Sequence, residues 1–193
     1  MKSTRILLSG FTALALLTGC GGSSMADMTD MADSAVDAAK DAIGFNDDDV
    51  MFAQMMIPHH EQAVVMSDLA LSTSKDADVL KLAKQIKDAQ APEIIKMQGW
   101  LSDAGLSKDP GHSMGNGMGG MLSDSDLSAL KGSTGKAFDK LFLAGMIAHH
   151  EGAIDMVMMI ENSPNGDVNN LGQEIVKSQS AEIELMKELL KRK

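Results

Sequence analysis

The chain has 193 residues, a formal net charge of −10 at pH 7 and an aromatic content of only 3%. That length is enough for one domain with a real hydrophobic core. An acidic chain without basic clusters argues against binding to nucleic acid and against electrostatic attraction to anionic lipids. No phosphate-binding loop, nucleotide motif or nucleophile constellation is visible, so hydrolase and nucleotide-dependent activities have no support.

The first 19 residues have the features of a bacterial lipoprotein signal peptide. Lys2 and Arg5 precede an apolar run, residues 6–17, which is too short to span a bilayer. The sequence Leu17-Thr18-Gly19-Cys20 follows and resembles a lipobox, which implies cleavage before Cys20 and lipidation of its sulfur. Cys20 is the single cysteine, so no disulfide can form within the mature chain. We therefore expect a lipid-anchored protein of the cell envelope that faces the periplasm or the exterior.

The mature chain divides into a tether and one helical domain. Residues 20–45 are rich in Ala, Asp, Met and Ser, and we expect them to form the lipidated tether. Residues 46–193 form the predicted domain, which consists of a first repeat (46–104), a loop rich in Met and Gly (105–122) and a second repeat (123–193).

The repeat is visible residue by residue. Residues 55–66, Met-Met-Ile-Pro-His-His-Glu-Gln-Ala-Val-Val-Met, match residues 145–156, Gly-Met-Ile-Ala-His-His-Glu-Gly-Ala-Ile-Asp-Met. The match extends to pairs on either side: Asp49 and Asp139, Phe52 and Phe142, Gln90 and Gln179, Glu93 and Glu182, Met97 and Met186. Each unit has the pattern of a helical hairpin, and two hairpins predict an all-α, antiparallel, ferritin-like four-helix bundle.

The ends of the helices can be predicted from capping residues and turns. The first helix should begin at the capping residues 46–49, and residues 72–76 should separate it from a second helix that ends near Gly105. A short helix is expected near 125–131, the third long helix after Thr134, and the fourth after the turn at 163–166. Pro58 and Pro92 lie inside the first two long helices, where we expect kinks.

Helical periodicity places one set of soft side chains on or beside the inward faces. A helix advances about 100° per residue, so Met56, His59 and His60 are neighbours that can converge on one point. The candidate ligands, in matching pairs, are Met56 and Met146, His59 and His149, His60 and His150, Met66 and Met156. Glu61 and Glu151 fall away from these faces.

Thioether sulfur suits copper(I) and the similarly soft silver(I), while imidazole binds both borderline and soft ions. A Met ligand needs no deprotonation, so such a site works outside the cell, where thiols are oxidised. Glu93 and Glu182 fit two interpretations: they satisfy His60 and His150 as ordinary buried histidines, or they orient them as metal ligands. We favour the second, because the same spacing occurs twice in a chain with 17 Met residues.

The loop between the repeats contains further Met and His residues on a Gly-rich backbone. His112, Met114, Met118 and Met121 could capture copper and pass it inward, or they could belong to a plain linker. Two other functions stay open. An inward set of Asp49, Glu93, Asp139 and Glu182 would suit a di-iron or di-manganese oxidase, although the usual Glu-x-x-His spacing is missing. A purely structural envelope bundle is the third possibility.

The doubled Met-Ile-x-His-His-Glu-x-Ala motif, each copy preceded by Asp and Phe, resembles the ferritin-like domain-of-unknown-function 305 family, which includes CopM-like copper-binding envelope proteins. The similarity covers about residues 46–193. It implies a four-helix bundle, an extracytoplasmic location, and binding of copper(I) or silver(I) by Met and His in copper tolerance. Apart from the resemblance, a metal-trafficking protein is a further candidate partner. Gly145 stands opposite Met55, so any ligand role of Met55 is not doubled.

Overall fold

A computed structural model describes residues 34, 37–38, 40, 44–108 and 119–193. The predicted signal peptide, Cys20 and nearly all of the predicted tether lie outside these residues, as do His112, Met114 and Met118. The described part of the chain is all-helical and contains no strand. None of its helices combines the length and the apolar character needed to cross a membrane.

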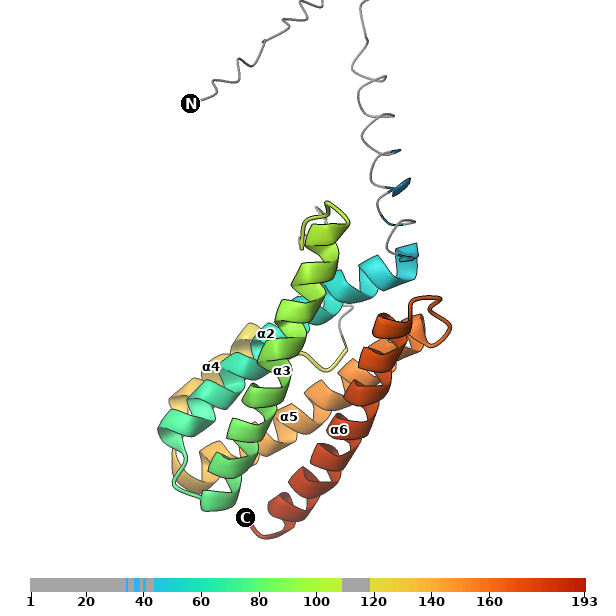
Figure 1. Ribbon diagram of the computed structural model, residues 1–193. Helices are drawn as coiled ribbons and strands as arrows, with labels where there is room; N and C mark the ends of the chain where they lie inside the picture. Colours follow the sequence, from blue (N-terminus) through green and yellow to red (C-terminus); the bar gives the residue numbers. More distant parts are fainter. Residues whose placement is uncertain (1–33, 35–36, 39, 41–43, 109–118) are drawn as a thin grey trace, which may run out of the picture.

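Two long hairpins make up most of the fold (Figure 1). In the first, α2 (Asp47–Thr73) is followed by α3 (Ala77–Asp103). The short α4 (Asp124–Gly132) leads to the second, in which α5 (Gly135–Val157) and the 3₁₀ turn η1 (Met158–Ile160) precede α6 (Gly166–Lys191). The antiparallel helical architecture predicted from the repeat is confirmed.

Local sequence explains where these helices begin and end. Asn46 and Asp49 form a reciprocal capping box at the start of α2, and Asp76 and Asn165 accept hydrogen bonds from the first turns of α3 and α6. Gly105 adopts a φ of +69° just after α3, a left-handed conformation that glycine tolerates without a steric penalty. Both α2 and α3 continue across their internal prolines.

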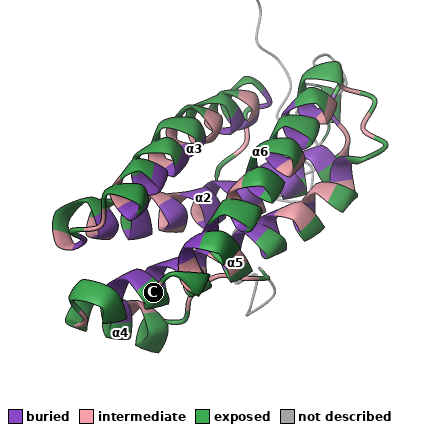
Figure 2. Cartoon of the chain, turned by 90° about the horizontal axis from the view of Figure 1, so that it is seen from below, coloured by how far each residue is buried: buried purple, intermediate pink, exposed green. Residues whose placement is uncertain are grey.

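The hairpins meet mainly through α2 and α5, which form the central pair of helices, while α3 and α6 touch each other much less. Buried residues line the faces that α2 and α5 turn toward each other and toward α3 and α6, and the outer faces are exposed (Figure 2). Ion pairs tie the end of the chain after α6 to the first hairpin, where Arg192 pairs with Asp78 at 3.0 Å and Lys193 pairs with Asp76. Lys193 also pairs with Asp139 of α5 at 3.4 Å. The seam between α2 and α5 is therefore the centre of the protein.

Candidate metal centre

Four histidine rings lie in the seam between α2 and α5, and all four are fully buried. The rings of His59 and His149 face each other across the seam, with centroids 3.8 Å apart and planes 38° apart. Each lies 6.4 Å from the second histidine on its own helix, His60 or His150. The near-identical spacings show that the sequence repeat is also a structural two-fold repeat.

The outer histidine of each pair is held by a carboxylate from the neighbouring helix. His60 Nε2 lies 2.8 Å from Glu93 Oε2, and His150 Nε2 lies 2.7 Å from Glu182 Oε2. An ionised carboxylate can only accept, so Nε2 carries the proton in both rings and donates it. In the neutral form of the ring, Nδ1 is then the atom with a free lone pair, which is the arrangement expected of an oriented metal ligand.

Most of the remaining ring nitrogens are buried without a hydrogen bond. Among the described residues, no partner is found for Nδ1 of His59, His60, His149 and His150, or for Nε2 of His149. His59 Nε2 is satisfied by the carbonyl oxygen of Gly119 at 3.0 Å. A buried polar group left unsatisfied costs about 1–3 kcal/mol, so several such nitrogens in one place make this seam the candidate site.

The histidines that face each other are neutral at ordinary pH. Burial lowers the pKa of His59 to about 4, although the Gly119 carbonyl acts in the opposite direction. Burial, together with the neighbouring His59, also places the pKa of His149 well below its usual 6.5. Neutral imidazoles keep the lone pair that a metal ion needs, so these two rings require no deprotonation before they bind one.

The predicted thioethers are buried on either side of the histidines. Met56 and Met156 belong to one apolar core cluster, and Met66 and Met146 belong to the other. Each cluster thus combines one predicted Met from α2 with one from α5, as a two-fold arrangement requires. The methyl carbon of Met66 lies 3.5 Å from the position that a Cβ on Gly145 would take, which places this side chain against α5.

Two further methionines, outside the set of predicted ligands, complete this pattern. Met97 on α3 is fully buried in the cluster of Met56 and Met156, and Met186 on α6 is fully buried in the other. Their match in the repeat is the signal that could have revealed them. Their positions give each half of the core three thioethers, one from each of three helices.

The remaining candidate residues lie elsewhere. Met121 is half-buried and lines a groove of about 310 Å³ beside α4 and α5, which none of the eight predicted ligands lines.

The carboxylates of the di-metal alternative form hydrogen bonds in separate parts of the fold. Asp49 belongs to the cap of α2, and Asp139 accepts a hydrogen bond of 2.6 Å from Ser74. Within residues 44–108 and 119–193, no three His, Cys, Asp or Glu side chains converge to hold a metal ion.

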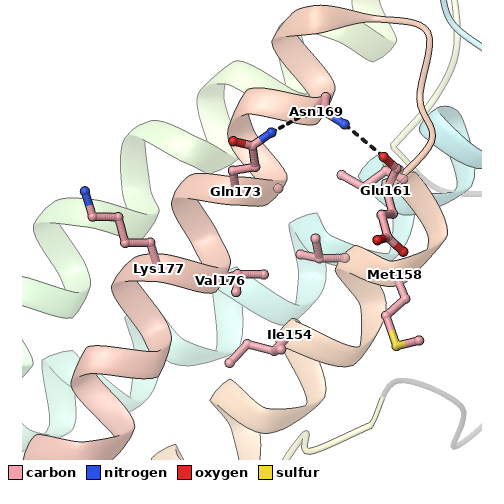
Figure 3. Close-up of a pocket in the computed structure, with 10 residues that line it drawn as sticks. Ile154, Met158, Glu161, Asn169, Gln173, Val176 and Lys177 are labelled. Carbon is pink, nitrogen blue, oxygen red and sulfur yellow. Dashed lines mark hydrogen bonds between the residues drawn. The ribbon is translucent and has the colours of Figure 1, made fainter.

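A surface groove of about 530 Å³ lies between α5 with η1 and α6 (Figure 3). It is largely apolar. Within it, the Asn169 side chain donates to the backbone carbonyl of Glu161 at 3.0 Å and accepts from the Gln173 side chain. None of the predicted ligands lines this groove. The candidate centre is therefore the buried seam rather than this groove.

Comparisons with known proteins agree with this architecture. The model of the family described as "Domain of unknown function (DUF305)" matches residues 49–190. Among solved structures, a Streptomyces coelicolor DUF305 protein is 35% identical (TM-score 0.70; 75% of this chain and 93% of that one covered). A Deinococcus radiodurans DUF305 fragment is 29% identical (TM-score 0.71; coverage 77% and 98%).

The structure of CopM in its Cu(I)-bound form is 32% identical to this chain (TM-score 0.63; coverage 75% and 96%). CopM has also been solved in Cu(II)-bound, silver-bound and metal-free forms. A search of curated proteins finds no match. Because the family model covers both hairpins and a solved relative is 35% identical to it, this chain belongs to the DUF305 family.

Proposed function

We propose that this chain binds copper(I), and the similarly soft silver(I), in the seam between α2 and α5, and that it holds or transfers the metal without catalysing a reaction. The proposed ligands are Met56, His59, His60, Met66, Met146, His149, His150 and Met156. Glu93 and Glu182 would orient the two outer histidines, and Met97 and Met186 are additional thioethers within the same clusters.

One observation carries the proposal: four fully buried histidines present five ring nitrogens that have no partner in the described part of the chain, between two buried groups of thioethers. In a purely structural bundle those unsatisfied nitrogens would lower the stability of the fold, and no function would compensate for that cost. Imidazole nitrogen and thioether sulfur together match the preference of a soft monovalent ion. Bound metal would complete the nitrogens that the fold leaves open.

The relatives support the same ions. CopM, which is similar to this chain along three quarters of its length, has been crystallised with copper and with silver. The carboxylate placement does not favour a di-iron or di-manganese oxidase, because Asp49 and Asp139 bond elsewhere and the two Glu side chains each bind a histidine. Storage or transfer of the metal needs no reactive group beyond these ligands.

We further propose that the protein works in the cell envelope, lipid-anchored at Cys20, with residues 20–45 as its tether. The lipobox-like sequence supports this location, and the Streptomyces coelicolor relative is described as a candidate secreted protein. Thioethers and imidazoles keep their ligand function in an oxidising compartment. A metal-trafficking protein would then be the natural partner for delivery.

The test is a copper(I) titration of metal-free protein against a competing chelator. Met56→Leu together with Met146→Leu removes two sulfurs at nearly constant volume, a change that costs less than about 1.5 kcal/mol of stability per site. We expect copper(I) affinity to fall by at least about tenfold, the lower bound seen when a ligand loses its outer hydrogen-bond partner. The matched control is Met158→Leu, because Met158 is 71% exposed and lies outside both core clusters. Unchanged affinity in the double variant would refute the assignment of the thioethers.

A further inference from the structure

Residues 119–122, which we call the strap, lie across the seam between α2 and α5. On the α2 side, the Gly119 carbonyl accepts from His59 Nε2 at 3.0 Å. The Gln62 side chain forms two hydrogen bonds with the backbone of Leu122: Leu122 N donates to Gln62 Oε1 at 2.7 Å, and Gln62 Nε2 donates to Leu122 O at 3.0 Å. The strap is thus bonded to the helix that carries His59.

On the α5 side, the strap packs directly against backbone. A Cβ on Gly152 would lie 1.8 Å from the Gly119 oxygen and 2.3 Å from its carbonyl carbon. Gly120 adopts a φ of +80°, and a Cβ there would lie 2.1 Å from the oxygen of Ala148. The clashing atoms belong to the backbone of the strap, so no local side-chain movement could relieve the clash. A side chain at position 152 would therefore displace the whole strap from the seam.

The strap also explains two of the positions where the sequence repeat breaks down. Gln62 and Gly152 occupy equivalent positions, and each has the side chain that the strap requires: one bonds it and the other leaves space for it. Met55 and Gly145 form a second mismatched pair, and a Cβ on Gly145 would lie 3.1 Å from the Leu122 side chain. Both departures from symmetry serve contacts with one segment that has a single copy in the chain.

We propose that the strap makes the two facing histidines chemically inequivalent, so that copper(I) held through His59 binds more tightly than copper(I) held through His149. The Gly119 carbonyl can only accept, so it fixes His59 with its proton on Nε2 and its lone pair on Nδ1. The His59 backbone acts on His149 in the same direction, opposing the fall of its pKa, but neither ring nitrogen of His149 reaches a partner at hydrogen-bond geometry among the described residues, so its tautomer is left open. A ligand held in its binding tautomer loses less freedom on binding. Gln62 and Gly152 are positioning residues that act through the strap, and this inference rests on the proposed copper(I) function.

The first experiment needs no metal. Ring ¹⁵N shifts in NMR spectra of the metal-free protein report which nitrogen of each histidine carries the proton. Gln62→Ala removes both bonds to Leu122, and Gly152→Ala displaces Gly119; either should convert His59 from the pure Nε2–H form to a mixture. The matched controls are Gln54→Ala, on the same helix but bonded to the Ser107 carbonyl, and Gly99→Ala, at a helical glycine where an added Cβ would meet no atom within 4 Å. Both controls should keep the wild-type tautomer.

The second experiment measures copper(I) affinity by chelator competition. Wild-type protein should show two unequal affinities, and the strap variants should weaken the tighter one by about 10- to 100-fold, the usual effect of removing a ligand's outer partner. An unchanged His59 tautomer in both strap variants, or a His149 tautomer as fixed as that of His59, would overturn the inference. Failure of wild-type protein to bind copper(I), with His59 fixed as described, would overturn the proposed function and the affinity difference while supporting the tautomer assignment.

Discussion

Mild acid should destabilise the metal-free protein through its buried histidines. In the unfolded chain His59 is protonated with its ordinary pKa of 6.5. In the folded protein, burial lowers this pKa to about 4. The unfolded state therefore binds more protons between these values, and the free energy of unfolding falls as the pH drops from about 6.5 toward 4. The total loss of unfolding free energy is roughly 3 kcal/mol, because each unit of pKa difference between the two states corresponds to about 1.4 kcal/mol.

Urea denaturation at pH 7 and pH 5, with a chelator present, measures this loss. Between pH 7 and pH 5, His59 should lower the free energy of unfolding by roughly 2 kcal/mol. The lowered pKa of His149 lowers it further. His59→Leu keeps a side chain of similar bulk in the core and removes the titrating ring, so its loss between the two pH values should be smaller by roughly 2 kcal/mol. Carboxylates that titrate over the same range are common to both proteins and cancel in the difference.

Equal losses in wild-type and His59→Leu protein would refute the reasoning, because they would mean that His59 is accessible to protons in the folded state. Saturating copper(I) provides a second check on the same protein. Metal bound to the rings competes with protons and stabilises the folded state by mass action, so it should shift the acid-induced loss to lower pH.

Two other predictions concern the site and the anchor. Replacing His60 and His150 with Ala should lower copper(I) affinity, in competition titrations, by more than replacing Glu61 and Glu151, because both histidines are buried whereas Glu151 is exposed and Glu61 pairs at the surface with Lys108. Equal effects would show that the inward faces are misassigned. Cys20→Ala should move the protein from the membrane fraction to the soluble fraction while its copper(I) affinity stays the same; a variant that remains with the membranes would contradict lipid anchoring.

The repeat made much of this fold predictable from sequence. A doubled motif fixes two equivalent hairpins, and helical periodicity then identifies their buried faces, so the burial of the eight predicted ligands follows from local rules. The hydrogen bonds that His60 donates to Glu93 and His150 donates to Glu182 could also be predicted, because the matching residues recur on the partner helices. The start of α5 at Gly135 agrees with a boundary predicted just after Thr134.

The features that the sequence did not reveal depend on how the hairpins meet. Periodicity places His59 and His149 on their helices, but it does not say that α2 and α5 are the pair in contact, and so it could not predict rings 3.8 Å apart. Nor could it predict the strap, whose contacts join residues about 60 positions apart through backbone atoms. The difference between Gln62 and Gly152 is explained only by the strap, which contacts both positions.

The most direct test of the central claim is anomalous diffraction at the copper absorption edge from crystals of copper(I)-loaded protein. Copper peaks should appear in the seam between α2 and α5, within bonding distance of histidine nitrogens and methionine sulfurs from both hairpins. Copper found only at surface carboxylates or at exposed residues such as Met158, with the four buried rings unliganded, would contradict the claim.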